Sequence, residues 1–252
     1  MKISSTHYLN HTFSSIKAII FDCDGTLIDS EQFHFLAWQT VFQQEGQTLT
    51  KEFYVNHFCG VGDVAILQIA AESLKSSSAK ELLARKHQFF HEYQKAGISP
   101  IVSTVEFATN LFQQKEKRGL KLAVASGAKK KEIIQHLKML NIEHYFEVIL
   151  SGHDDLSEYQ DPEGTNKPKP YVYLKAANLL GVAPHECIAI EDSKTGLASA
   201  VDAGCLAIAI PNEYTREHDL SRAHITIESF ADLSVDDFFN KIASSRLSCD
   251  PR

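Results

Sequence analysis

Short apolar runs rich in β-branched residues recur along this chain, and segments with helical periodicity separate most of them. The runs predict strands over residues 15–21, 120–125, 145–150, 187–190 and 205–210, with a shorter one over 224–227. Continuous apolar runs of this length are typical of strands that a parallel sheet buries on both faces. Strands that alternate with helices require right-handed crossovers, so the pattern predicts an α/β fold with a doubly wound, Rossmann-like parallel sheet.

Apolar residues at helical spacing predict four helices between these strands, over residues 104–118, 129–140, 170–180 and 193–203. Gly119, Gly181 and Gly204 directly follow three of these segments, in the position where glycine commonly ends a helix. Residues 151–170 are acidic and contain several glycines and prolines, so we expect a long loop there.

Residues 31–98 interrupt the alternation of strands and helices. They contain no run that predicts a strand, but they contain helical patterns rich in aromatic residues. Aromatic residues at this spacing more often form a helical core than a ligand site. We therefore expect an α-helical cap domain over residues 31–98, with a turn over residues 73–79. It would be inserted into a core formed by residues 16–30 and 99–252.

The composition argues against several functional classes. The chain has 252 residues, of which 44% are hydrophobic, so it can bury a full core. Its formal net charge of -7 disfavours nucleic acid as a partner. No apolar run approaches the length of a membrane span, and residues 1–15 lack the apolar segment of a signal peptide. We therefore expect a cytoplasmic protein that binds no membrane, and the sequence shows no obligate protein partner.

The cysteines support the same location. The chain has five cysteines, which are Cys23, Cys59, Cys187, Cys205 and Cys249. The number is odd, and no two of them form a CxxC motif. Disulfide frameworks and structural zinc sites use regular cysteine spacing, so we expect reduced thiols here.

Polar residues stand where the predicted strands end. These positions carry carboxylates, a hydroxyl beside a glycine, and a lysine: Asp22 and Asp24, Ser126 and Gly127, Lys167, and Glu191 and Asp192. Because ligands of open α/β sheets bind at the carboxyl ends of the strands, we expect one site to contain them all. The lysine, the hydroxyl and the amides around the glycine are suited to a phosphoryl group.

The carboxylates predict a divalent cation at this site. Converging carboxylates repel one another and raise their own pKa values unless a cation lies among them. Oxygen ligands without histidine or cysteine favour Mg²⁺. Two carboxylates spaced as Asp22 and Asp24 can divide the work, one attacking phosphorus and the other transferring the proton. An Asp-x-Asp-Gly turn alone is often only a capped loop, but Lys167 and Asp192 argue against that interpretation.

Four motifs in order along the chain resemble those of the haloacid dehalogenase superfamily, phosphatase branch. They are Asp22–Thr26 (DxDGT), the strand that ends in Ser126, Lys167–Pro170, and Glu191-Asp192-Ser193 with Gly196 and Ala203-Gly204. The resemblance is to the subgroup that contains β-phosphoglucomutase and related sugar phosphatases, and it covers about residues 16–210. It implies a cap at the position of the helical insert.

The resemblance also implies roles for the acidic residues. Asp22 is implied as the nucleophile and a Mg²⁺ ligand. Asp24 is implied as the general acid and base, with its backbone carbonyl on the metal. Asp192 is implied as a further ligand, with Glu191 beside it, bound directly or through water. The dehalogenases themselves lack the second aspartate, so a carbon–halogen substrate is not expected.

The remaining site residues are expected to bind substrate. Ser126 with Gly127 would hold the transferring phosphoryl group, and Lys167 would neutralise its charge and that of the nucleophile. Thr26 completes the first motif. His34 lies in a stretch similar to that around the hinge-side histidine of β-phosphoglucomutase, although a histidine on a helix is more often structural.

Several positions depart from the family pattern. Asn166 stands where a glycine usually precedes the lysine, and Tyr171 stands where an aspartate is usual, so Lys169 is kept as an alternative to Lys167. Asp63 stands where the mutase has an arginine that binds a second phosphate. Because an acidic residue repels a second phosphate, the sequence favours a phosphatase over a mutase.

Three functions are compared on these grounds. The first is Mg²⁺-dependent hydrolysis of a small phosphate monoester, such as a sugar phosphate or similar metabolite, through an aspartyl-phosphate intermediate. The alternative is a β-phosphoglucomutase-like sugar phosphomutase, which would depend on a bisphosphate activator. The third is a regulator that binds phosphorylated metabolites without turnover, and the complete set of catalytic residues disfavours it.

Overall fold

Six parallel strands form the central sheet of the computed structural model, which describes residues 16–59, 66–70, 74, 78–95 and 97–248. The strands are β1 (Ala18–Phe21), β4 (Lys121–Ser126), β5 (Val148–Ser151), β6 (Cys187–Glu191), β7 (Leu206–Ala209) and β8 (Ile225–Thr226). Their order is β5-β4-β1-β6-β7-β8, and every neighbouring pair is parallel. The prediction of an α/β fold with a doubly wound parallel sheet is confirmed.

The two faces of the sheet present side chains of different sizes. Successive residues of a strand point to opposite faces. In β1, Ile19 and Phe21 therefore face one layer of helices, whereas Ala18 and Ile20 face the other. Alanines from β4, β6 and β7 lie in the same layer as Ala18. Small side chains on that face allow the helices to approach the sheet closely.

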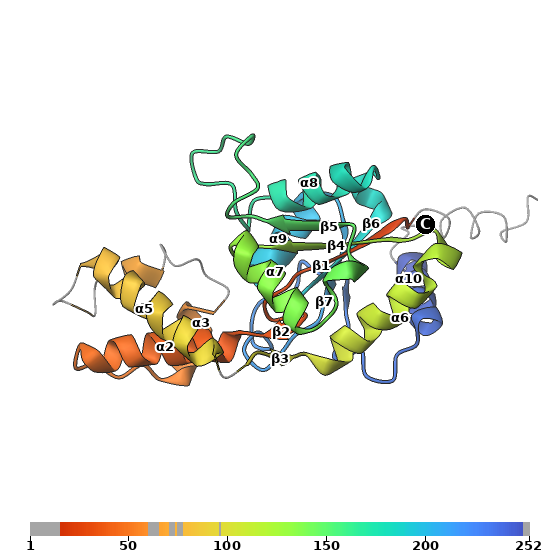
Figure 1. Ribbon diagram of the computed structural model, residues 1–252. Coiled ribbons are helices and arrows are strands. Elements are labelled where there is room, and N and C mark those ends of the chain that lie inside the picture. Colours follow the sequence, from red (N-terminus) through yellow and green to blue (C-terminus); the bar gives the residue numbers. More distant parts are fainter. Residues whose placement is uncertain (1–15, 60–65, 71–73, 75–77, 96, 249–252) are drawn as a thin grey trace, which may run out of the picture.

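Helices cover both faces of the sheet, so its strands are buried on both sides (Figure 1). α6 (Val102–Arg118), α7 (Lys130–Met139) and α10 (Val235–Ser248) pack against the larger side chains. α8 (Tyr171–Leu180) and α9 (Lys194–Asp202) pack against the alanine-rich face. Apart from their end residues, α6 to α9 coincide with the four predicted helices, whereas α10 was not predicted.

A further group of helices lies beside the sheet (Figure 1): α2 (Glu31–Gln44), α3 (Lys51–His57) and α5 (Ala79–Gln94), with residues 66–70 also helical. We call residues 31–98 the helical insert. Aromatic side chains dominate its core, among them Trp38, Tyr54 and Phe58. These rings meet mostly edge to face, a favourable arrangement for aromatic pairs.

Two short strands connect the helical insert to the sheet. β2 (Ile28–Asp29) enters the insert, β3 (Ser99–Pro100) leaves it, and the two pair antiparallel. Neither was predicted, because two residues are too few to show an alternating pattern. The division into a core and a cap at residues 30/31 and 98/99 stays a prediction.

Some predictions fall on residues that the structure does not describe. These are Asp63, most of the turn over residues 73–79, the N-terminal residues 1–15 and Cys249. Within the described part of the chain, no helix has both the length and the apolar sequence that crossing a bilayer requires.

Candidate active site

The candidate site lies where the order of the strands reverses. From β1 the chain crosses to β4 and β5 on one side, then returns to β6 on the other side of β1. In sheets of this topology the loops on the two sides diverge and form a crevice at the carboxyl ends of the strands, where ligands bind. Asp22 follows β1, Ser126 ends β4 and Glu191 ends β6.

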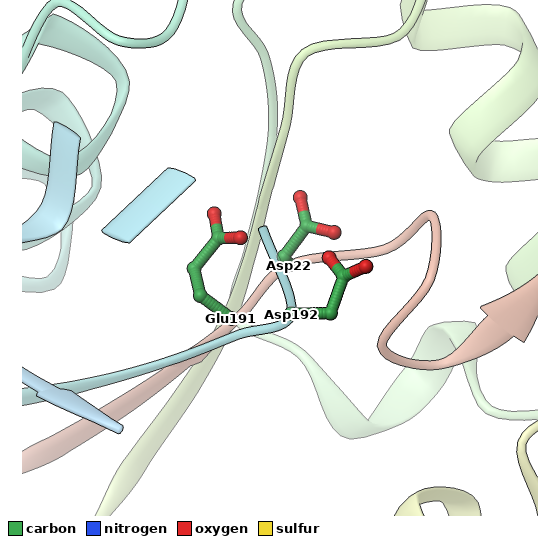
Figure 2. Close-up of side chains that lie close together, drawn as sticks. All are labelled: Asp22, Glu191 and Asp192. Carbon is green, nitrogen blue, oxygen red and sulfur yellow. The ribbon is translucent and has the colours of Figure 1, made fainter. Parts of the chain in front are cut away.

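Three buried carboxylates converge in this crevice. Asp22, Glu191 and Asp192 each offer an oxygen, and these oxygens lie within 4.8 Å of one another. Figure 2 shows the three side chains close together at the ends of two neighbouring strands. The sequence predicted this convergence from strand ends that are about 170 residues apart in the chain.

Among the described residues, Lys167 places its ammonium group in contact with these carboxylates. Its Nζ atom donates to Asp22 Oδ1 and to Glu191 Oε1, both at 2.6 Å, and to the carbonyl of Ala125 at 2.8 Å. Lys169, the alternative from the sequence, pairs instead with Glu163 and Asp161 on the acidic loop. The geometry thus places Lys167, and not Lys169, beside the proposed nucleophile.

Burial makes it costly to ionise two of these carboxylates, those of Asp22 and Asp192. It raises the pKa of Asp22 to about 8, although the Lys167 ammonium acts in the opposite direction. Burial also raises the pKa of Asp192 well above its usual range, and the charge of Asp22 adds to this effect. For Lys167, burial lowers the pKa, but the carboxylates of Asp22 and Glu191 outweigh burial and the pKa lies above its ordinary value.

A divalent cation fits this imbalance of charge. One ammonium cannot neutralise three carboxylates, and a cation bound by their oxygens would favour the ionised form of each. The ligand atoms are all oxygen, the type that Mg²⁺ prefers. The three side chains are also buried, which strengthens their attraction to a cation.

Asp24 points to a different set of partners. Its carboxylate accepts hydrogen bonds from Ser30 Oγ at 2.8 Å and from Ser126 Oγ at 3.1 Å. Ser126 Oγ in turn accepts from the backbone N–H of Ala128 at 3.1 Å. Asp24 is therefore held beside the hydroxyl that was predicted to bind the phosphoryl group, on the opposite side from β6.

Asn166 gives a physical reason for one departure from the family pattern. Its Nδ2 donates to the carbonyl of Gly127 at 2.9 Å, and its Oδ1 accepts from the backbone N–H of Lys167 at 2.8 Å. A side chain at Gly152 would overlap with this amide. Asn166 thus joins the loop of the lysine to the turn after β4, and glycine could form neither side-chain bond.

The predicted substrate residues differ in their surroundings. Thr26 has no exposed surface, and its hydroxyl has no hydrogen-bond partner among the described residues. Gly127 lies in the turn after β4 that Asn166 holds. His34 lies on α2 of the helical insert, and its ring stacks on that of Phe90, with 4.1 Å between the centroids. Their roles in binding substrate stay predictions.

Residues 19–210 match the haloacid dehalogenase-like hydrolase family, and this span contains all four motifs. The chain belongs to this family. The family resemblance inferred from the four motifs is therefore confirmed.

Relatives in the haloacid dehalogenase-like family match most of the chain. The phosphorylated carbohydrates phosphatase of Thermotoga maritima is 28% identical over 86% of this chain and 92% of that protein. The β-phosphoglucomutase of Bacillus subtilis is 26% identical over 77% of this chain and 83% of that protein. The crystal structure of CbbY from Rhodobacter sphaeroides in complex with phosphate is 25% identical. It has a TM-score of 0.71 and covers 88% of this chain and 98% of that one.

The family match, with relatives named as phosphatases, confirms the predicted class of enzyme. The chain is a phosphatase of the haloacid dehalogenase-like family. Its fold, a six-stranded parallel sheet with helices on both faces, is similar to that of the solved CbbY structure.

Two buried residues of this family member were not predicted. Tyr173, on α8, donates its hydroxyl hydrogen to Glu191 Oε1 at 2.6 Å. Lys86, on α5, is 3% exposed, with its Nζ 5.3 Å from the centre of the Phe90 ring. The sequence held a signal for Lys86, because it stands at the helical spacing of the buried Leu82 and Phe90. A lysine on the buried face of a helix is rare unless it is paired or functional.

Proposed function

We propose that this phosphatase hydrolyses a small phosphate monoester, such as a sugar phosphate or similar metabolite, with Mg²⁺ and through an aspartyl-phosphate on Asp22. The observation that carries the proposal is the buried Asp22 carboxylate, 2.6 Å from the Lys167 ammonium and beside Asp192 and Glu191. The acidic net charge of the chain disfavours nucleic acid as the partner, whereas a small anionic metabolite can bind at a locally positive group such as the Lys167 ammonium.

In the first step, a carboxylate oxygen of Asp22 attacks phosphorus and the bond from phosphorus to the leaving oxygen breaks. Asp24 gives its proton to that oxygen, so the alcohol departs while Asp22 carries the phosphoryl group. In the second step, Asp24 takes a proton from a water molecule, and the water oxygen attacks phosphorus. The bond between phosphorus and the Asp22 oxygen breaks, so inorganic phosphate leaves and the Asp22 carboxylate is regenerated.

Lys167 and the acidic cluster supply the electrostatic environment for these steps. The Lys167 ammonium orients Asp22 and offsets the charge of the incoming phosphate. Asp22, Asp192 and the backbone carbonyl of Asp24 would hold Mg²⁺, with Glu191 beside them, and the bound ion would offset negative charge on the reacting phosphoryl group.

The helical insert is proposed as the cap of the site. On one side, Gln94 of α5 lies 3.4 Å from His136 of α7. On the other side, the His218 ring N–H donates to the carbonyl of Val55, the two atoms being 3.1 Å apart. Contacts on both sides support an insert that covers the crevice and excludes bulk water from the phosphoryl enzyme. Specificity for the alcohol would then reside in the insert.

Asp22→Asn tests the proposed nucleophile, because it removes the attacking carboxylate and keeps the size of the side chain. Turnover of p-nitrophenyl phosphate with Mg²⁺ should fall by about 10³-fold or more. Asp161→Asn is the matched control on the exposed acidic loop and should change turnover by less than about twofold. Unchanged turnover in a folded Asp22→Asn protein would contradict the proposed mechanism.

A sugar phosphomutase is the second candidate, and the mutase among the relatives is the observation that favours it. A mutase would transfer the phosphoryl group of Asp22 to sugar and would depend on a bisphosphate activator. Release of inorganic phosphate from a sugar phosphate, at the same rate with and without a sugar bisphosphate, would argue against the mutase. Isomerisation faster than phosphate release would favour it.

A further inference from the structure

The side chain of Asn212, which follows β7, uses all of its hydrogen-bonding capacity. Its Nδ2 donates to Asp192 Oδ2 at 2.8 Å and to the carbonyl of Gly25 at 3.0 Å. Its Oδ1 accepts from the backbone N–H groups of Tyr214 at 2.8 Å and Thr215 at 3.1 Å. Two donors and two acceptors on one amide leave a single orientation for the group.

The Nδ2 end of Asn212 joins two parts of the proposed metal site. Gly25 has a φ of +85°, and a side chain there would overlap with the Asp192 carboxylate, so this turn packs tightly against Asp192. A hydrogen bond to one oxygen of Asp192 restricts rotation of the carboxyl group. Groups that hydrogen-bond to metal ligands in this way orient them for the metal.

The Oδ1 end of Asn212 holds a loop that contacts the helical insert. Within this loop, Glu213 pairs with Lys51 of α3, and the Lys51 Nζ lies 4.6 Å from the centre of the Tyr214 ring. The Tyr214 ring also meets that of Tyr54 edge to face, with 6.3 Å between the centroids. One amide therefore lies between the metal-binding carboxylate and the contact surface of α3.

A role in the loop alone would not explain this arrangement. Asparagine often stabilises a turn through its side-chain oxygen, and the Nδ2 group then needs no partner in the protein. Here Nδ2 donates to two groups of the proposed active site instead. The side chain is thus positioned for both the site and the loop.

We propose that Asn212 is a positioning residue that orients Asp192 for Mg²⁺ and connects this orientation to the contact between the loop and the helical insert. The inference rests on the proposed function, because it concerns the Mg²⁺ of that reaction. Since one amide stabilises both arrangements, Mg²⁺ binding and the contact with α3 strengthen each other, and the coupling acts equally in both directions.

Calorimetric titration with Mg²⁺, without substrate, tests the first half of the inference. Asn212→Ala removes both ends of the amide. Asn212→Ser keeps a hydroxyl that can accept from the loop N–H groups but cannot replace the two donors, so it serves if the alanine variant does not fold. Both should weaken Mg²⁺ binding by about 10- to 100-fold. Glu217→Gln, a change at an exposed position of the same loop, should change it by less than about twofold.

Amide hydrogen exchange in residues 51–57 tests the second half. Mg²⁺ should slow exchange there in the wild type, and it should do so much less in the two Asn212 variants. Equal Mg²⁺ affinity in wild type and both variants would overturn the inference and leave the proposed function standing. A wild type that binds no Mg²⁺ would overturn both. Equal protection of residues 51–57 by Mg²⁺ in all proteins would overturn the coupling.

Discussion

Lys167 and Lys169 stand two residues apart, yet their environments differ in kind. The Lys167 side chain is 9% exposed and contacts the proposed nucleophile, whereas Lys169 pairs with acidic residues on an exposed loop. An ion pair in a buried site acts across a low dielectric, while an exposed pair is screened by water. At the scale of single residues, the depth of each lysine therefore decides its role.

Replacement of the two lysines by methionine should separate these roles. Lys167→Met should lower the rate of p-nitrophenyl phosphate hydrolysis by about 10²- to 10³-fold, because the charge beside Asp22 and the phosphate is lost. Lys169→Met, the same change two residues away, should lower it by less than about twofold. Steady-state kinetics at saturating Mg²⁺ checks both, and equal losses in the two variants would contradict the assignment.

Glu31 provides a residue-scale prediction about stability. It begins α2 and accepts a hydrogen bond from the Tyr54 hydroxyl. Burial raises the pKa of Glu31 above its ordinary value of 4.5, although the Tyr54 hydrogen bond acts in the opposite direction. The folded state therefore holds this proton more tightly than the unfolded state. Between the unfolded and folded pKa values, stability is lost as the pH rises.

Glu31→Gln removes this titration. The free energy of unfolding of the variant, relative to wild type, should rise with pH from about 4.5 and level off above the folded pKa. Urea unfolding at a series of pH values, with EDTA present, measures the difference. A difference that does not vary with pH would contradict the prediction.

At the scale of elements, the join between β6 and α9 determines where the acidic cluster lies. Ser193 caps α9 by accepting from the backbone N–H of Gly196, and Ser193 Oγ also lies 3.3 Å from Glu191 Oε2. The first turn of α9 therefore packs directly onto the carboxylate of Glu191. A side chain at Gly196 would overlap with that carboxylate.

Gly196→Ala should lower the free energy of unfolding, although replacing glycine by alanine within a helix usually raises it. Alanine in a helix is ordinarily more stable than glycine by about 1 kcal/mol. Here the added methyl group must displace Glu191, so we expect a loss of about 1–3 kcal/mol in unfolding free energy, with reduced activity. Lys194→Ala, at an exposed position of the same turn, is the control. Urea unfolding measures both, and a more stable Gly196→Ala protein would show that the overlap is relieved without cost.

At the scale of the whole molecule, the sheet and the helical insert contribute different parts of the proposed site. The strand ends carry the groups that act on phosphorus, while α2 and α5 carry His34 and Lys86 on the insert. Such a division would allow one chemical mechanism to serve different alcohols, because the phosphoryl group and the rest of the substrate would be bound by separate segments.

Lys86→Met tests this division. For a sugar phosphate, kcat/KM should fall by about tenfold or more, because a buried cation on the insert is lost. For p-nitrophenyl phosphate, which has no sugar to bind, kcat/KM should change by less than about threefold. An equal loss of kcat/KM on both substrates would indicate that Lys86 acts in the chemical step or in folding, and not in substrate specificity.

The sequence by itself determined the class of fold and the acidic residues of the site. Apolar runs report burial on both faces of a strand, and the polar residue that ends each run must lie at one edge of a parallel sheet. Asp22, Glu191 and Asp192 were therefore predicted to meet, and they do. The strands β2 and β3 were missed, because two residues show no period.

The tertiary structure alone decided which partners complete the site. The sequence favoured Lys167, the lysine of the third motif, but kept Lys169 as an alternative, and the path of the acidic loop shows that the first of them reaches Asp22. Tyr173 and Asn212 follow no pattern that sequence periodicity detects, since each contacts residues from a separate segment. Periodicity reports which side of an element is buried, whereas the identity of a distant partner depends on how the elements pack.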